Sequence, residues 1–147
     1  MIGRLHHLVI DAPDPAALAR FYAALLGLPV TYETADFVVV SVDTTTSGLA
    51  FQRAPDLIPP DWPDPARPQQ MHHDVMVDDV AEAHAQVLAL GARHLATDGH
   101  GSRVYADPAG HPFCLIPRPS WSQGCSPTPK PGSGCAPRGW SPPVNPR

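Results

Sequence analysis

An internal duplication constrains this chain more than any other feature. An apolar run that reads as a strand is followed by a helix cap, a helical pattern and a glycine, once within residues 5–27 and again within residues 71–91. Each predicted helix starts after an aspartate N-cap and stops at a glycine, as helix signals require. The caps are Asp14 and Asp79, and the glycines are Gly27 and Gly91.

Three short runs typical of β-strands follow each predicted helix. They are residues 30–33, 37–42 and 48–53 in the first half, and residues 93–96, 103–106 and 112–116 in the second. Together with the opening strands, residues 5–10 and 71–77, each half reads βαβββ. Neither half closes a core alone, so the two curved mixed sheets must pair, within the chain or between chains, around a concave pocket. The sequence therefore predicts an α+β fold.

The composition divides the chain into a domain and a tail. Residues 1–118 form the predicted domain, made of modules 4–53 and 71–117 that a proline-rich loop, residues 54–70, joins. Residues 119–147 are rich in Pro, Ser and Gly and have no hydrophobic period, so we expect them to be disordered. The three cysteines are an odd number and predict no disulfide framework.

Charge and hydropathy exclude two classes of partner. All fourteen acidic residues lie before Pro117, where only six arginines and no lysine occur. Such an acidic body argues against nucleic-acid binding through phosphate neutralisation. The sequence has no run of about eighteen apolar residues and no signal-peptide pattern at its start, so we expect no membrane partner and a cytoplasmic location.

Strand alternation selects the residues that face the concavity. His7 lies seven residues before cap Asp14, and His72 lies seven residues before cap Asp79, so the repeat places both histidines on the inward face. In the last strand of each half, the same alternation places Ala50 and Gln52 of the first half and Cys114 of the second half on the inward face. The side chains of His7, Gln52, His72 and Cys114 are thus predicted to converge.

Three stretches resemble a known superfamily. The likeness is to the signature stretches of the vicinal-oxygen-chelate superfamily, which includes glyoxalase, bleomycin-resistance and extradiol-dioxygenase domains. The three stretches that resemble them are HHLVIDAPDPAALARFYAALLGLPV, MHHDVMVDDVAEAHAQVLALGA and YADPAGHPFCLI. The likeness is greatest to its glyoxalase-like bacterial branch and covers roughly residues 4–116. It implies paired βαβββ modules, and metal ligands at His7 and His72, with Gln52 and Cys114 at positions where many members carry a ligand, often Glu.

The departures from the family pattern bear on the metal. A cysteine sulfur at position 114 favours zinc if it ligates, because thiolates are soft ligands. Gln52 cannot take a proton, so it cannot replace a carboxylate base, and Asp74 is the candidate for that catalytic role. Alternatively, no metal binds, both histidines are hydrogen-bonded pocket residues and Cys114 packs as a small hydrophobe.

Two functions follow as alternatives. One is a divalent-metal-dependent lyase or isomerase that acts on a small molecule; the other is a metal-free protein that sequesters a small molecule, as bleomycin-resistance proteins do. Trp62 in the proline-rich loop, Met76 and Ala50 are the candidate pocket residues. His6 and His73 are expected on the helix-facing side. We also expect a homodimer, because pairing the halves across a two-fold axis covers exposed strand edges.

Overall fold

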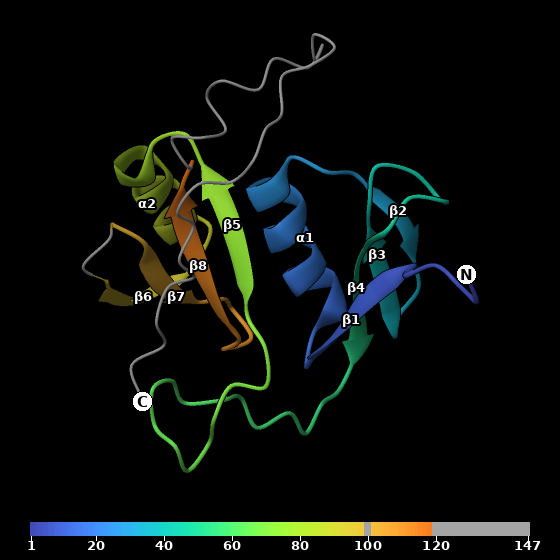
Figure 1. Ribbon diagram of the computed structural model, residues 1–147. Coiled ribbons are helices and arrows are strands. Elements are labelled where there is room, and N and C mark those ends of the chain that lie inside the picture. Colours follow the sequence, from blue (N-terminus) through green and yellow to red (C-terminus); the bar gives the residue numbers. More distant parts are fainter. Residues whose placement is uncertain (99–100, 119–147) are drawn as a thin grey trace, which may run out of the picture.

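The chain is described from a computed structural model, in which residues 1–98 and 101–118 are placed. The predicted tail, residues 119–147, and His100 lie outside the described residues. Both halves have the predicted order βαβββ (Figure 1). The first half consists of β1 (His7–Ala12), α1 (Pro15–Leu26), β2 (Val30–Glu33), β3 (Phe37–Val40) and β4 (Gly48–Arg53). The second consists of β5 (His73–Val77), α2 (Val80–Ala89), β6 (Arg93–Thr97), β7 (Arg103–Ala106) and β8 (Pro112–Pro117).

Each half forms one mixed four-stranded sheet. The strand orders are β1-β4-β3-β2 and β5-β8-β7-β6, and in both sheets the first strand pairs with the last in parallel while the other pairs are antiparallel. This is the α+β architecture that the sequence predicts. Two opening strands start later than predicted, at His7 and at His73, and β3 ends at Val40 because residues 41–46 turn away from the sheet.

The helix caps are those that the sequence predicts. The Asp14 carboxylate accepts a hydrogen bond from the backbone N–H of Ala17, and the Asp79 carboxylate accepts from Ala81 and Glu82. These bonds satisfy amide groups that lack partners in the first helical turn. Gly27 ends α1 in the left-handed conformation, with φ 65°, which a residue without a Cβ adopts at no steric cost.

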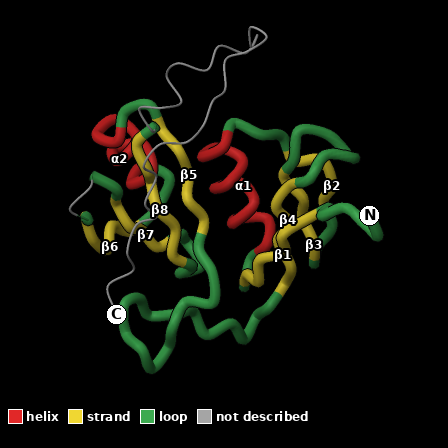
Figure 2. The backbone as a smooth tube through the Cα atoms, viewed as in Figure 1, coloured by secondary structure: helices red, strands yellow, loops and turns green. Residues whose placement is uncertain are grey.

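One hydrophobic core joins the two halves. Helix α1 lies between the two sheets (Figure 1, Figure 2), and its Phe21 ring meets the Phe113 ring of β8 at a centroid distance of 5.8 Å. The alternate residues Ile10 of β1 and Leu115 of β8 face this core and are buried. The helix-facing surfaces of both sheets are thus packed inward, and the opposite surfaces, which carry His7 and Asp74, point outward.

A buried hydrogen bond also crosses between the halves. The Tyr22 hydroxyl on α1 donates to Asp107 Oδ2 at 2.9 Å, and both residues are buried. Asp107 Oδ1 accepts from the backbone N–H groups of Ala109 and His111, and the Gly110 N–H donates to the Asp107 carbonyl, so residues 107–110 form a turn. No helix in the described part of the chain is long and apolar enough to cross a membrane.

Candidate metal site

Three potential metal ligands come together on the outer face of the second sheet. Asp74 on β5 is paired in register with Cys114 on β8, and His72 precedes β5. One ligating atom from each of the three residues lies within 4.8 Å of the other two. His72 and Asp74 are exposed, whereas Cys114 is buried beneath them. The arrangement is a partly open site with one imidazole, one carboxylate and one thiol.

The His72 ring is held on two sides. Its Nε2 lies 3.5 Å from Asp74 Oδ1, and its Nδ1 lies 3.4 Å from the Gln69 side-chain nitrogen. Gln69 can either donate to Nδ1 or, with its amide turned over, accept a proton from it. A ligating histidine needs such a partner on its other nitrogen, because that partner fixes the orientation of the ring. Gln69 was not predicted from the sequence, in which its only signal is its position three residues before His72.

Cys114 is a protonated thiol in the absence of a metal. Burial, together with the charge of Asp74 and a hydrogen bond to it, raises the pKa of the Cys114 thiol to about 12. Asp74 therefore stabilises the S–H form, and a metal ion that binds the sulfur must displace this proton. This coupling makes metal binding weaker as the pH falls.

His7 occupies a separate hollow on the first sheet. Its ring stacks on that of His6 at a centroid distance of 3.8 Å, and the hollow of about 310 Å³ is also lined by Tyr32, Phe37 and Val39. The expectation that His6 lies on the helix-facing side is wrong, because β1 begins at His7 and the preceding backbone does not continue the strand alternation. Burial and the neighbouring His6 lower the pKa of His7.

Of the four side chains that were predicted to converge, the structure brings two together. His72 and Cys114 share the cluster on the second sheet, whereas His7 and Gln52 belong to the first sheet, on the other side of α1 (Figure 1). The reason is the packing of α1: with both helix-facing surfaces in one core, the outer faces of the two sheets cannot meet within one chain. Gln52 is exposed on β4, opposite Asp11 and Phe37.

The three predicted pocket residues have different surroundings. Met76 is 48% exposed on β5, on the same face as Asp74. Ala50 is fully buried in the first sheet, so its side chain offers no surface to a ligand in this conformation. Trp62 is half-buried in the loop between the halves, and it does not line the hollow of about 550 Å³ that this loop forms with β1.

His73 and His111 have roles that the sequence did not reveal. His73 lies on the helix-facing side as expected, with its ring 5.8 Å from that of Tyr22. Its Nε2 is buried and, among the described residues, has no hydrogen-bond partner; burial lowers its pKa. His111 donates from Nε2 to the backbone carbonyl of Asp11 at 2.7 Å and so connects the two halves.

A known protein family matches most of this chain. The family described as a glyoxalase-like domain matches residues 7–116, which includes every helix and nearly every strand residue described above. No curated protein sequence matches the chain significantly.

Solved structures support the same fold. The fosfomycin resistance protein FosX from Listeria monocytogenes is similar, with a TM-score of 0.62, 15% identity, and coverage of 82% of this chain and 97% of that chain. A glyoxalase/bleomycin resistance protein/dioxygenase family enzyme from Burkholderia phytofirmans PsJN has a TM-score of 0.60 and 16% identity, covering 78% and 98%. The oxidase ChaP-H2 has a TM-score of 0.57 and 26% identity, covering 81% and 96%.

Proposed function

Because the chain belongs to the glyoxalase-like domain family, we propose that it is a divalent-metal-dependent enzyme of the lyase or isomerase type that acts on a small molecule. The observation that carries this proposal is the cluster of His72, Asp74 and Cys114, whose ligating atoms lie within 4.8 Å of one another. Two of these residues, His72 and Cys114, stand where the sequence resemblance places ligands.

The donor set fits zinc better than a harder ion. Ligand atoms that bind Zn²⁺ at about 2.0–2.3 Å in a tetrahedron lie about 3.3–3.7 Å apart. One ligating atom of His72 and the sulfur of Cys114 lie within 4.8 Å of each other, a separation that small side-chain rotations bring into this range. A thiolate together with an imidazole favours zinc over magnesium or manganese.

A third ligand, beside His72 and Cys114, would come from a second copy of the chain. The outer faces of both sheets carry exposed apolar side chains, Tyr32 beside His7 at 56% exposure and Met76 beside Asp74 at 48%. A homodimer that pairs the first sheet of one subunit with the second sheet of the other covers both faces. His7 of the partner subunit would then join His72 and Cys114, which gives three protein ligands and leaves a position open for substrate.

Each residue of this site would have a separate role in the reaction. When bound, the ion acts as a Lewis acid that polarises the substrate oxygens it contacts. Asp74 accepts the proton that the reaction removes, because its carboxylate lies beside the ligands and Gln52 has no ionisable group. Gln69 holds the His72 ring in the orientation that ligation needs. Tyr32 and Phe37 line the hollow that holds His7, so in the dimer their rings would form the opposite wall and shield the substrate from water.

Metal analysis tests the proposal. We expect untagged protein dialysed against zinc, nickel, manganese and iron(II) in turn to retain one ion per subunit, most tightly zinc, and His72→Ala and Cys114→Ala to lose it. His94→Ala, on the exposed strand β6 of the same sheet, is the matched control and should retain the metal. If the wild-type protein retains none of these ions, metal catalysis fails, and a metal-free small-molecule binder becomes the function to test.

Subunit mixing tests the shared site. Neither His7→Ala nor His72→Ala alone should retain zinc, but after denaturation and joint refolding the mixed dimers should contain one intact site each. Zinc retention that stays at the level of the separate variants would show that the two histidines do not serve one site across the dimer. Analytical ultracentrifugation that finds only monomer at micromolar concentration would contradict the same arrangement.

A further inference from the structure

A second hollow lies between the two halves, away from the metal cluster. It has a volume of about 550 Å³ and is enclosed by strand β1, the loop of residues 54–70 and the start of strand β8. None of His72, Asp74 and Cys114 lines it; the adjacent His73 does, because its side chain points to the opposite face of β5. The hollow is within the size range of ligand-binding clefts, about 300–1,000 Å³.

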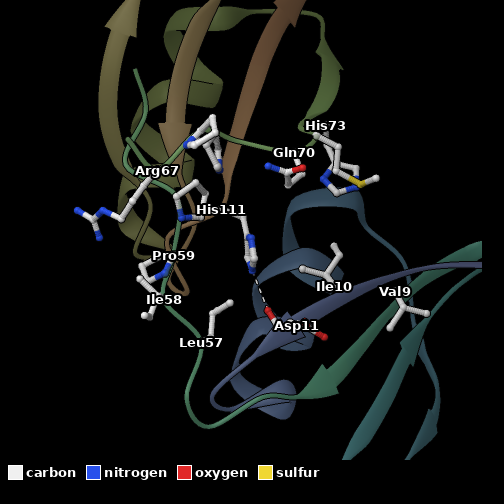
Figure 3. Close-up of a pocket in the computed structure, with 14 residues that line it drawn as sticks. Val9, Ile10, Asp11, Leu57, Ile58, Pro59, Arg67, Gln70, His73 and His111 are labelled. Carbon is white, nitrogen blue, oxygen red and sulfur yellow. Dashed lines mark hydrogen bonds between the residues drawn. The ribbon is translucent and has the colours of Figure 1, made fainter. Parts of the chain in front are cut away.

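Most of the wall is apolar and stiff. Leu57 and Ile58 of the loop face Val9 and Ile10 of β1 across the opening (Figure 3). Proline rings supply much of the rest, at positions 59, 60, 68 and 112. Proline rings pack well against aromatic faces, as in the recognition of proline-rich peptides, and their fixed backbone lowers the entropy lost on binding. The wall thus favours a planar aromatic body.

The polar residues that line the hollow are Asp11, Arg67, Gln70, His73 and His111. The charges of Asp11 and Arg67 are opposite in sign, so the lining suits an uncharged ligand. Arg67 lies at the rim, but its guanidinium donates to Asp61 at 2.7 Å and points away from the opening (Figure 3). Figure 3 shows Gln70 beside His73 on the side opposite Leu57, where its amide offers one donor group and one acceptor. His111 lies between these sides; since Nε2 donates to the Asp11 carbonyl, Nδ1 of the neutral ring is an acceptor.

We propose that this hollow between the halves is a binding site for an uncharged aromatic hydroxyl compound, a phenol or naphthol, separate from the metal site. The ring system packs between the proline-rich loop and β1. The hydroxyl donates to His111 Nδ1 or Gln70 Oε1 and accepts from the Gln70 amide. Because the ligand touches both halves and the loop, it stabilises their packing, and its binding does not require the metal.

The probe is 2-naphthol, measured by isothermal titration calorimetry on the full chain with zinc and after removal of zinc. Two matched compounds separate the contributions: 2-methoxynaphthalene keeps the rings but cannot donate a hydrogen bond, and 2-decalol keeps the hydroxyl but is not aromatic. We expect 2-naphthol to bind one site per subunit, at least about fivefold more tightly than either compound, with and without zinc.

Two variants locate the site. Leu57→Asp puts a carboxylate into the apolar wall and should weaken 2-naphthol binding at least about tenfold, whereas Leu88→Asp, on α2 and 40% exposed, should leave it unchanged. Gln70→Leu should reduce the preference for 2-naphthol over 2-methoxynaphthalene. Circular dichroism checks that each variant is folded, and zinc retention should remain as in the wild type.

Three results would overturn the proposal. They are the lack of saturable 2-naphthol binding by the wild-type protein, an equal loss in Leu57→Asp and Leu88→Asp, and binding that is present only with zinc and is removed by Cys114→Ala. The last result would place the ligand at the metal site and would leave the proposed metal function intact. Failure of zinc retention alone would leave the aromatic site standing.

Discussion

The hydrogen bond between Tyr22 and Asp107 should be one of the largest single contributions to the packing of the two halves. Tyr22 is 1% exposed and Asp107 is 4% exposed, and the residues are 85 positions apart in the sequence. Tyr22→Phe removes the hydroxyl with little change in volume and leaves the two backbone donors to Asp107 Oδ1 in place. The change therefore isolates one buried hydrogen bond to a carboxyl group.

We expect Tyr22→Phe to lower the free energy of unfolding by about 1.5–3 kcal/mol at pH 7, the range for a hydrogen bond to a charged group. For a domain of this size, with an unfolding entropy of about 2.1 cal/mol/K per residue, the thermal midpoint should fall by roughly 6–12 °C. Urea unfolding measures the free energy and calorimetry the midpoint. Tyr32→Phe, on the exposed strand β2, is the control and should change the free energy by less than about 0.5 kcal/mol.

The pH dependence gives a second test. Burial raises the pKa of Asp107, and the Tyr22 hydrogen bond lowers it in part. Because the pKa of the Asp107 carboxyl is higher in the folded than in the unfolded protein, ionisation of this carboxyl lowers the stability of the folded state. Its contribution to folding stability is fully present below the unfolded pKa, near 3.8, and is lost as the pH rises through the folded pKa. Tyr22→Phe raises that folded pKa further. Its destabilisation should therefore be smaller at pH 4 than at pH 7.

Two results would refute this reasoning. A loss of less than about 0.5 kcal/mol at pH 7 would mean that Asp107 finds another donor or that the two halves contribute little to each other's stability. A loss that does not change between pH 4 and pH 7 would mean that Asp107 does not ionise over that interval. A double-mutant cycle with Asp107→Asn should give a coupling free energy of about 1 kcal/mol or more.

Three further predictions concern other parts of the chain. Cys114 of the metal-free protein should react slowly with iodoacetamide at pH 8, and Asp74→Asn should accelerate the reaction, because Asp74 contributes to the raised pKa of the thiol. Mass spectrometry of the Cys114 peptide measures the rate, and an unchanged rate would contradict the role of Asp74. Gly48→Ala should lower the free energy of unfolding in urea by about 1–3 kcal/mol, because a Cβ at position 48 would meet Ser41 Cβ at 2.5 Å. A loss of less than about 0.5 kcal/mol would show that the turn can shift. A chain that ends at Arg118 should keep the thermal midpoint of the whole chain within about 2 °C, and a drop of many degrees would place the domain boundary further on.

The sequence by itself determined the local structure of both halves. The caps Asp14 and Asp79, the glycine stops and the alternation of apolar residues act over a few positions. They therefore determine the helices, the strands and which residues of a strand share a face, without reference to distant residues. The repeat and the strand alternation also placed His72, Asp74 and Cys114 on the strand faces that the helix does not cover. The parallel pairing of β5 with β8, which brings Asp74 beside Cys114, is seen only in the structure.

Only the tertiary structure decided how the two halves sit together. Helix α1 packs Phe21 and Tyr22 against the second sheet, and this long-range contact turns the outer faces of the two sheets away from each other. For that reason His7 and His72, although equivalent in the repeat, lie in separate places within one chain. The hollow between the halves, beside His111, also depends on this packing, because its walls come from β1, the loop of residues 54–70 and β8. A local sequence pattern cannot predict contacts among segments that are distant in sequence.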